Sequence, residues 1–237
     1  YLIHKLEGVM DNLIGGCSSF RDPFICQSIS DQCDYLGFTG KKVDLFTSFY
    51  FQALDESKPN IHSDYYSAAY AGVYAEKMVK GLDSHQASNW ATIFAEGYIQ
   101  GLEICKRSDK PVEKALEFAR LFVSEIVGKN HTKEFAYSYA LKKIEDNPEE
   151  YCVIFAHFKD TEKMSDVEAQ KRATIGLKIY EKQTRVLKET NTDQKTLEDI
   201  ALVYTMKILS GNGAEYAEKF SSCFGFRSIQ NKPTEYK

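Results

Sequence analysis

The stretch Tyr70-Ala71-Gly72-Val73-Tyr74-Ala75 decides the fold, because it repeats an aromatic ring followed by alanine at an interval of four residues. Residues four apart lie one turn apart on the same face of an α-helix, and a neighbouring alanine lets another helix approach closely. The pattern therefore predicts helices that stack on one another. Further copies are Trp90-Ala91…Phe94-Ala95, Phe135-Ala136…Tyr139-Ala140 and Tyr151-Cys152…Phe155-Ala156, with looser ones at Phe118-Ala119…Phe122-Val123, Ile200-Ala201…Tyr204 and Tyr216-Ala217…Phe220.

The composition also favours an all-α protein with a large core. The chain has 237 residues, of which 43% are hydrophobic and 27% charged, values typical of a globular protein. It holds only 5 prolines, and no stretch sustains the alternation of a β-strand. We expect about ten helices arranged as an irregular helical repeat array. The alternative is an ordinary helical bundle in which the aromatic–alanine pattern arises by coincidence.

Glycine, proline and capping residues divide the chain. Residues 1–60 are expected to form an N-terminal helical cap, residues 61–226 the array, and residues 227–237 a flexible tail, with Ser57-Lys58-Pro59-Asn60 as the boundary turn. In the cap we expect helices over Tyr1–Ile14, from Asp22-Pro23 towards Tyr35, and over Lys41–Glu56. In the array, helix starts are expected at Ser63 or Asp64, Ser84–Ser88, Asp109-Lys110-Pro111, Thr132, Asn147-Pro148, Ser165, near Thr196 and after Gly211-Asn212-Gly213.

Charge and hydropathy argue against two classes of partner. The formal net charge is −4 and no segment concentrates basic residues, so nucleic-acid binding is not expected. No apolar run approaches the length of about 20 residues that a membrane-spanning helix needs.

Six cysteines point to a secreted protein. Cys17, Cys26 and Cys33 cluster near the N-terminus, but their spacing does not match zinc modules. An even number of cysteines, a start at Tyr1 and the sequon Asn130-His131-Thr132 together favour an extracellular protein with disulfides. A trimmed chain would also begin without methionine. In this secreted protein all six cysteines are candidates for disulfides: Cys17, Cys26, Cys33, Cys105, Cys152 and Cys223. The alternative is a cytosolic protein in which Cys105 and Cys152 are buried free thiols.

No pattern of residues in the sequence indicates a catalytic site, a cofactor site or a metal site. Gly211-Asn212-Gly213 lacks the Lys and Ser/Thr of a phosphate-binding loop and is expected to join two helices. Cys17 in Gly15–Ser19 has no companion base motif, and no Glu-x-x-His pair of a di-iron protein occurs. His157 is expected to be a core or seam histidine. The acidic residues Glu145, Asp146, Glu149 and Glu150 flank a helix junction, where solvated capping is expected.

The aromatic residues that recur at four-residue intervals are compatible with two functions besides packing. Surplus tyrosines can form a protein-binding face, and aromatic-lined helices can enclose an apolar ligand such as a lipid or pigment. The candidates for partner contact are Tyr65, Tyr66, Trp90, Tyr98 and Tyr137.

The recurring aromatic–alanine helices of Ser63 to Gly101, Phe118 to Ile144 and Ile200 to Phe220 resemble a class of secreted repeat proteins. These are Tyr/Ala helical-repeat salivary effectors of sap-feeding or gall-forming insects. The segments cover under half of the chain; Lys182-Gln183 matches a Lys-Gln pair of that class, but the turns here are irregular. The resemblance implies a secreted, non-enzymatic effector that acts on host proteins, and it assigns no catalytic residue.

We therefore expect a secreted, non-enzymatic protein that binds a protein partner, such as a host protein, through an aromatic helical surface. A carrier of an apolar small molecule and a self-assembling structural protein remain as alternatives.

Overall fold

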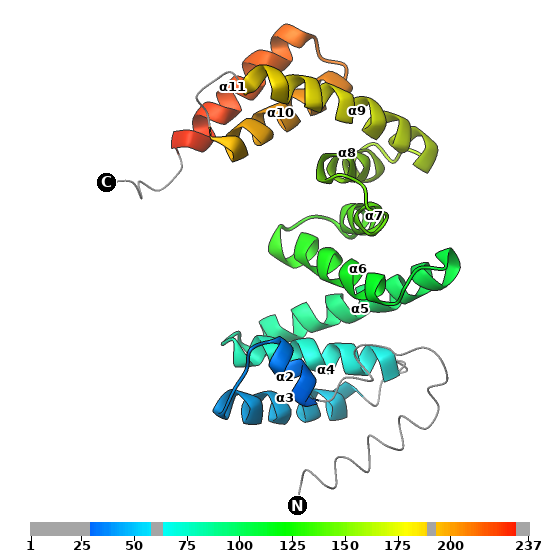
Figure 1. The fold of residues 1–237 in the computed structure, drawn as a ribbon, viewed down its shortest axis with the longest axis vertical. Coiled ribbons are helices and arrows are strands. Elements are labelled where there is room, and N and C mark those ends of the chain that lie inside the picture. The colour runs from blue at the N-terminus through cyan, green and yellow to red at the C-terminus, as the bar shows by residue number, and fades with distance from the viewer. Residues whose placement is uncertain (1–28, 58–63, 189–192, 231–237) are drawn as a thin grey trace, which may run out of the picture. The chain divides into compact units, whose positions relative to one another are not determined.

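The computed structural model describes residues 29–57, 64–188 and 193–230, which form ten α-helices and one π-helical turn without any strand (Figure 1). The prediction of an all-α fold with about ten helices is confirmed. The chain divides into two compact units, Tyr1–His131 (unit 1) and Thr132–Lys237 (unit 2). The expected helix over Tyr1–Ile14 lies outside the described residues.

In unit 1, each long helix packs against the helix before it and the helix after it in the chain. Contacts join α3 to α4, α4 to α5 and α5 to α6, while the short α2 contacts α3. The elements are α2 (Ile29–Tyr35), α3 (Lys41–Ser57), α4 (Asp64–Val79), α5 (Ser84–Ser108), α6 (Glu113–Val123) and the π-helical turn η1 (Ser124–Gly128).

Unit 2 follows the same rule of packing between sequence neighbours. Contacts join α7 to α8, α8 to α9, α9 to α10 and α10 to α11. Its helices are α7 (Lys133–Ile144), α8 (Glu149–Asp160), α9 (Asp166–Leu187), α10 (Gln194–Leu209) and α11 (Ala214–Gln230). Stability in such an array is close to a sum of helix terms and nearest-neighbour terms.

The aromatic–alanine pattern forms the packing face that the sequence predicts. The rings of Phe135 and Tyr139 on α7 stack with their centroids 6.3 Å apart and their planes only 9° from parallel. Ala136 and Ala140, which follow these rings in the sequence, have no exposed surface. Among the described residues, seven further pairs stack at i and i+4 with their planes within 28° of parallel: Phe46–Tyr50, Tyr66–Tyr70, Tyr70–Tyr74, Phe94–Tyr98, Phe118–Phe122, Tyr151–Phe155 and Tyr216–Phe220.

Most helix boundaries follow the capping signals. The Thr132 side chain accepts a hydrogen bond from the Phe135 amide at the start of α7, and Ser165 forms a capping box with Glu168 at the start of α9. Gly81 ends α4 with φ of +90°, a conformation that favours glycine.

The sequence predicts that Asn147 caps the start of α8, and this prediction is wrong. Pro148 is the residue that precedes α8, and it makes no side-chain capping bond. The Asn147 Nδ2 instead donates to the Lys142 carbonyl oxygen at 3.0 Å, so the asparagine closes the end of α7. Asn212 does the same after α10, where its Nδ2 donates to the Lys207 carbonyl oxygen at 3.0 Å. Gly211-Asn212-Gly213 therefore joins two helices, as expected.

The N-terminal helices belong to the same compact unit as the first helices of the array. α3 and α4, on either side of the turn proposed at residues 57–60, pack against each other. At the other end, α11 continues through Gln230, beyond the expected start of the tail at residue 227.

Glycine allows a close approach of two helices in unit 1. A Cβ atom added to Gly101 on α5 would lie 2.8 Å from the carbonyl oxygen of Ala115 and 2.9 Å from its Cα on α6. Both are backbone atoms, so the helices would have to separate to make room.

We expect Gly101→Leu to destabilise unit 1 by about 3 kcal/mol, because an overpacked helix contact forces the backbone apart. Urea unfolding followed by Trp90 fluorescence measures this, since Trp90 is the single tryptophan of the chain and lies in unit 1. The control is Gly128→Leu, where a Cβ meets only the Ser124 hydroxyl at 3.7 Å and the change should stay within about 0.5 kcal/mol. Equal unfolding midpoints for the two variants would contradict the packing described here.

Candidate functional site

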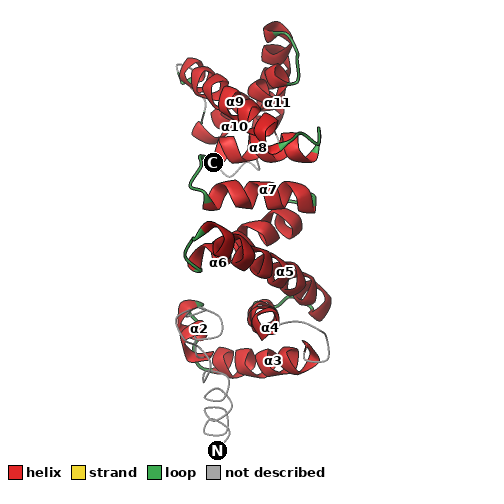
Figure 2. Cartoon of the chain, turned by 90° about the vertical axis from the view of Figure 1, so that its right-hand side faces the viewer, coloured by secondary structure: helices red, strands yellow, loops and turns green. Residues whose placement is uncertain are grey.

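A groove in unit 1 is the best candidate for a binding site, and we call it the α2 groove. Its volume is about 420 Å³, within the range of small-ligand sites. Figure 2 shows α2 beside α4 in the space between the end of α3 and α6. The lining residues are Gln32, Tyr35 and Leu36 of α2, Gly72, Val73, Glu76 and Lys77 of α4, Trp90 and Phe94 of α5, and Leu116, Arg120 and Val123 of α6.

A small hydrophobic cluster holds α2 in place over the groove. Cys33 of α2, Phe38, Phe46 of α3 and Ala75 of α4 are buried together. The Phe38 and Phe46 rings lie 6.0 Å apart. This cluster anchors α2 through Cys33, while Gln32 and Tyr35 of the same helix line the groove.

The floor of the groove is apolar and its rim is aromatic. Val73, Phe94 and Val123 are buried, with at most 6% of their surface exposed. Trp90 is half-buried, whereas the Tyr35 side chain is 67% exposed. The groove therefore opens to solvent on the side of α2.

A cation covers one face of each rim ring. The Lys77 ammonium lies 4.4 Å from the centroid of the Trp90 ring, and the Arg120 guanidinium lies 5.2 Å from the centroid of Tyr35. Such cation–π contacts hold a long side chain against a ring and orient both.

The rim carries an excess of positive charge. Glu76 is shared between Lys77 at 3.4 Å and Lys80 at 2.6 Å, so one carboxylate faces two ammonium groups. Within the described part of the chain, Arg120 has no carboxylate at ion-pair distance. Among the described side chains, an anionic ligand would meet positive charge that Glu76 balances only in part, in a chain whose formal net charge is −4.

The five residues predicted to contact a partner differ in exposure and in position. Trp90 lines the groove, Tyr65 and Tyr137 are 39% and 37% exposed, and Tyr66 is half-buried. The expectation for Tyr98 is wrong: it has no exposed surface, because its ring stacks on Phe94 inside the packing face of α5. The structure does not bring these five residues together at one site.

Sequence reasoning missed Tyr35 and Arg120. Tyr35 follows no aromatic–alanine pattern and comes from the short helix before Gly37. Arg120 is the last of four charged residues on α6, after Glu113, Lys114 and Glu117. It is exposed, whereas Phe118 and Phe122 are buried. Both are residue types that are common at protein interfaces, so composition alone is a signal for each. It does not predict that the two side chains lie close together.

The expected disulfides are absent among the described cysteines, so this expectation is corrected there. Cys33, Cys105, Cys152 and Cys223 are free thiols. The first three are buried in helices, as in the alternative of buried thiols, whereas Cys223 is exposed on α11. Cys17 and Cys26 lie outside the described residues.

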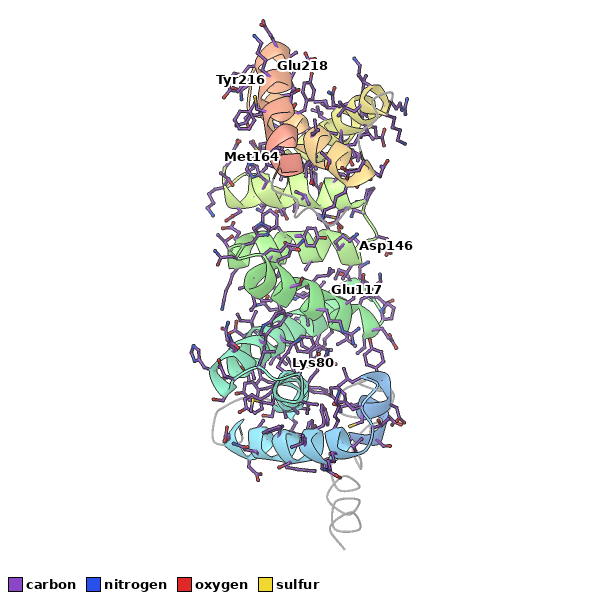
Figure 3. All side chains as sticks on the ribbon, turned by 90° about the vertical axis from the view of Figure 1, so that its left-hand side faces the viewer. Lys80, Glu117, Asp146, Met164, Tyr216 and Glu218 are labelled. Carbon is purple, nitrogen blue, oxygen red and sulfur yellow. The ribbon has the colours of Figure 1, made fainter. Side chains whose placement is uncertain are left out.

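Other polar residues singled out by sequence serve local structure. The half-buried His157 lies 3.5 Å from the Thr161 hydroxyl and edge-on to Phe158, and burial lowers its pKa. In the acidic group, Glu145 pairs with Lys142 at 2.8 Å. Glu149 pairs with Lys143 at 3.1 Å, and Asp146 lies at the turn between α7 and α8 (Figure 3).

Asn130 of the sequon is exposed, with φ of +58°, in the turn between η1 and α7. Its modification stays a prediction. Next to it, the buried Glu125 of η1 accepts from Lys129 at 2.7 Å and pairs with His131 at 2.8 Å. These contacts satisfy a buried carboxylate at the end of unit 1.

The described residues contain no group of three or more His, Cys, Asp or Glu side chains placed to hold a metal ion. None of their helices combines the length and the apolar character needed to cross a membrane. Comparison of the chain with protein-family models, with curated proteins and with solved structures finds no match.

We expect a thiol reagent to modify Cys223 of the folded protein much faster than Cys152. Burial raises the pKa of the Cys152 thiol to about 12, so at pH 8 it is almost entirely the unreactive thiol form and is also inaccessible. Timed alkylation followed by peptide mass spectrometry resolves the cysteines one by one. The unfolded protein is the control, in which both must react at similar rates. Rapid modification of Cys152 before unfolding would contradict its burial in α8.

Proposed function

We propose that this chain is a secreted, non-enzymatic effector that binds a partner protein, such as a host protein, through the α2 groove. The observation that carries the proposal is the grouping of Trp90, Tyr35 and Arg120 around one open groove. Tryptophan, tyrosine and arginine are the residue types that dominate binding energy in protein interfaces, especially around a pocket. Other large rings of the chain, such as Phe118 and Phe155, are buried in helix packing.

The form of the groove supports a protein partner over an enclosed apolar cargo. A carrier needs a sealed apolar cavity, whereas this groove opens beside the exposed Tyr35 and carries Glu76, Lys77 and Arg120. An open groove with a charged rim suits a protruding segment of another protein.

The experiment places a photo-crosslinking amino acid at Tyr35 and, in a second sample, at Tyr137 of unit 2. Each protein is exposed to an extract of a tissue that the producing organism contacts. A protein captured only from Tyr35 is then purified, and its affinity is measured by calorimetry. Tyr137 is the matched control, because it is also an exposed tyrosine on a helix.

We expect Trp90→Ala to weaken that affinity by about 2 kcal/mol, the loss typical of an interface hot spot. Tyr137→Ala should leave it within about 0.5 kcal/mol. Circular dichroism verifies that both variants stay helical. Loss of binding in Tyr137→Ala together with normal binding in Trp90→Ala would contradict the proposal.

A second candidate function, self-assembly, rests on α11. Tyr216, Phe220 and Phe224 follow one another at four-residue intervals and are 40% to 52% exposed, whereas the adjoining Ala217 is buried. Figure 3 labels Tyr216 on this last helix. The pair Tyr216–Phe220 has the stacked form that packs against a neighbouring helix elsewhere in the chain, so a second copy is a chemically matched occupant.

We expect sedimentation of the wild-type chain to depend on its concentration if this face joins two copies, and Phe220→Glu to abolish that dependence. The control is Leu45→Glu, an exposed apolar residue on α3. A wild-type chain that sediments as a monomer at all concentrations would exclude this second function.

A further inference from the structure

We propose that the α2 groove takes an acidic segment of the partner, in which an aromatic or leucine side chain stands beside carboxylates. This inference rests on the proposed function and adds the chemistry of the partner.

The apolar part of the segment follows from the floor of the groove. Val73, Phe94 and Val123 line the groove together with Trp90, and all three are buried. The volume of about 420 Å³ suits a few side chains of a protruding segment and excludes a folded domain. One large apolar side chain inserted here would lose its hydration against aliphatic and aromatic atoms, which is the main driving force of association.

The carboxylates follow from the rim. Lys77 stands on α4 and Arg120 on α6, so the groove carries a cation on two different helices. The negative charge of Glu76 is already shared between Lys77 and Lys80. Arginine in particular binds a carboxylate through two parallel hydrogen bonds, and its weak hydration favours burial in an interface.

The two separated cations also favour a peptide segment over a fatty acid. A fatty acid offers one carboxylate and a long chain that needs an enclosed tunnel. A peptide with acids on both sides of its apolar anchor can reach Lys77 and Arg120 at once, while its backbone remains in the open mouth of the groove beside Tyr35.

The test begins with selection of short random peptides on the full chain, with removal of peptides that also bind Trp90→Ala. We expect the surviving peptides to share an aromatic residue or leucine flanked by Asp or Glu. Survivors without an excess of acids, or no survivors at all, would overturn the inference.

The best survivor is then synthesised without tryptophan, and its binding is followed through the emission of Trp90. We expect Arg120→Gln to weaken binding about tenfold, and the peptide with Asn and Gln in place of its acids to bind about tenfold more weakly. Affinity should also fall as salt is added. The matched control is Arg107→Gln, an exposed arginine on α5 outside the groove, which should leave affinity unchanged.

Three outcomes of this binding measurement would also overturn the inference, and they separate it from the proposed function. Equal affinity of the acidic and the neutral peptide would show an apolar groove without charge selection, and the proposed function would stand. Equal affinity of the acidic peptide for Arg120→Gln and for the wild-type chain would show that the Arg120 charge does not contribute to binding, and the proposed function would again stand. A shift of Trp90 emission by sodium laurate but by no peptide would overturn both and favour a carrier.

Discussion

The whole architecture depends on how closely two helices approach where alanine or glycine faces a neighbouring helix. A stacked ring pair such as Phe135 and Tyr139 fills space one turn apart, and the fully buried Ala136 and Ala140 beside it leave room for the next helix. At Gly101 of α5, the Ala115 backbone lies so close that it leaves no room for a Cβ atom. Large and small side chains thus alternate on the helices that carry the aromatic–alanine pattern, so that the packing there is dense and stays local to neighbours in sequence.

The α2 groove exists because α2 departs from this arrangement. It is too short to present a full packing face, and its anchor is the cluster around Cys33 and Phe46 rather than a stacked ring pair. The remaining side of α2 faces α4 and α6 without filling the space between them. Trp90, which belongs to the repeated pattern, is consequently left half-buried at the edge of that space. An aromatic position of the pattern that is buried between helices in other copies, such as Phe118 or Phe155, here lines a groove.

Local sequence signals predict the elements of this protein well and the groove poorly. Periodicity and capping identify helices such as α7 and α9 because both depend on residues within a few positions of each other. Exposure of a given ring depends on a second helix instead. Tyr98 and Tyr65 belong to the same kind of stripe, yet one is enclosed and the other is 39% exposed. The site depends on Tyr35 meeting Arg120, a contact between segments far apart in the chain that no spacing rule encodes.

That long-range contact also sets an order of events during synthesis on the ribosome. Helices α4, α5 and α6 each pack against the helix made just before, so each can begin to pack as soon as it emerges. α2 is made first, but the surface that completes its surroundings includes Arg120 of α6, which is made last in this series. The binding surface of unit 1 is therefore finished only after its scaffold, and the nascent chain passes through a stage in which Trp90 still lacks its final surroundings.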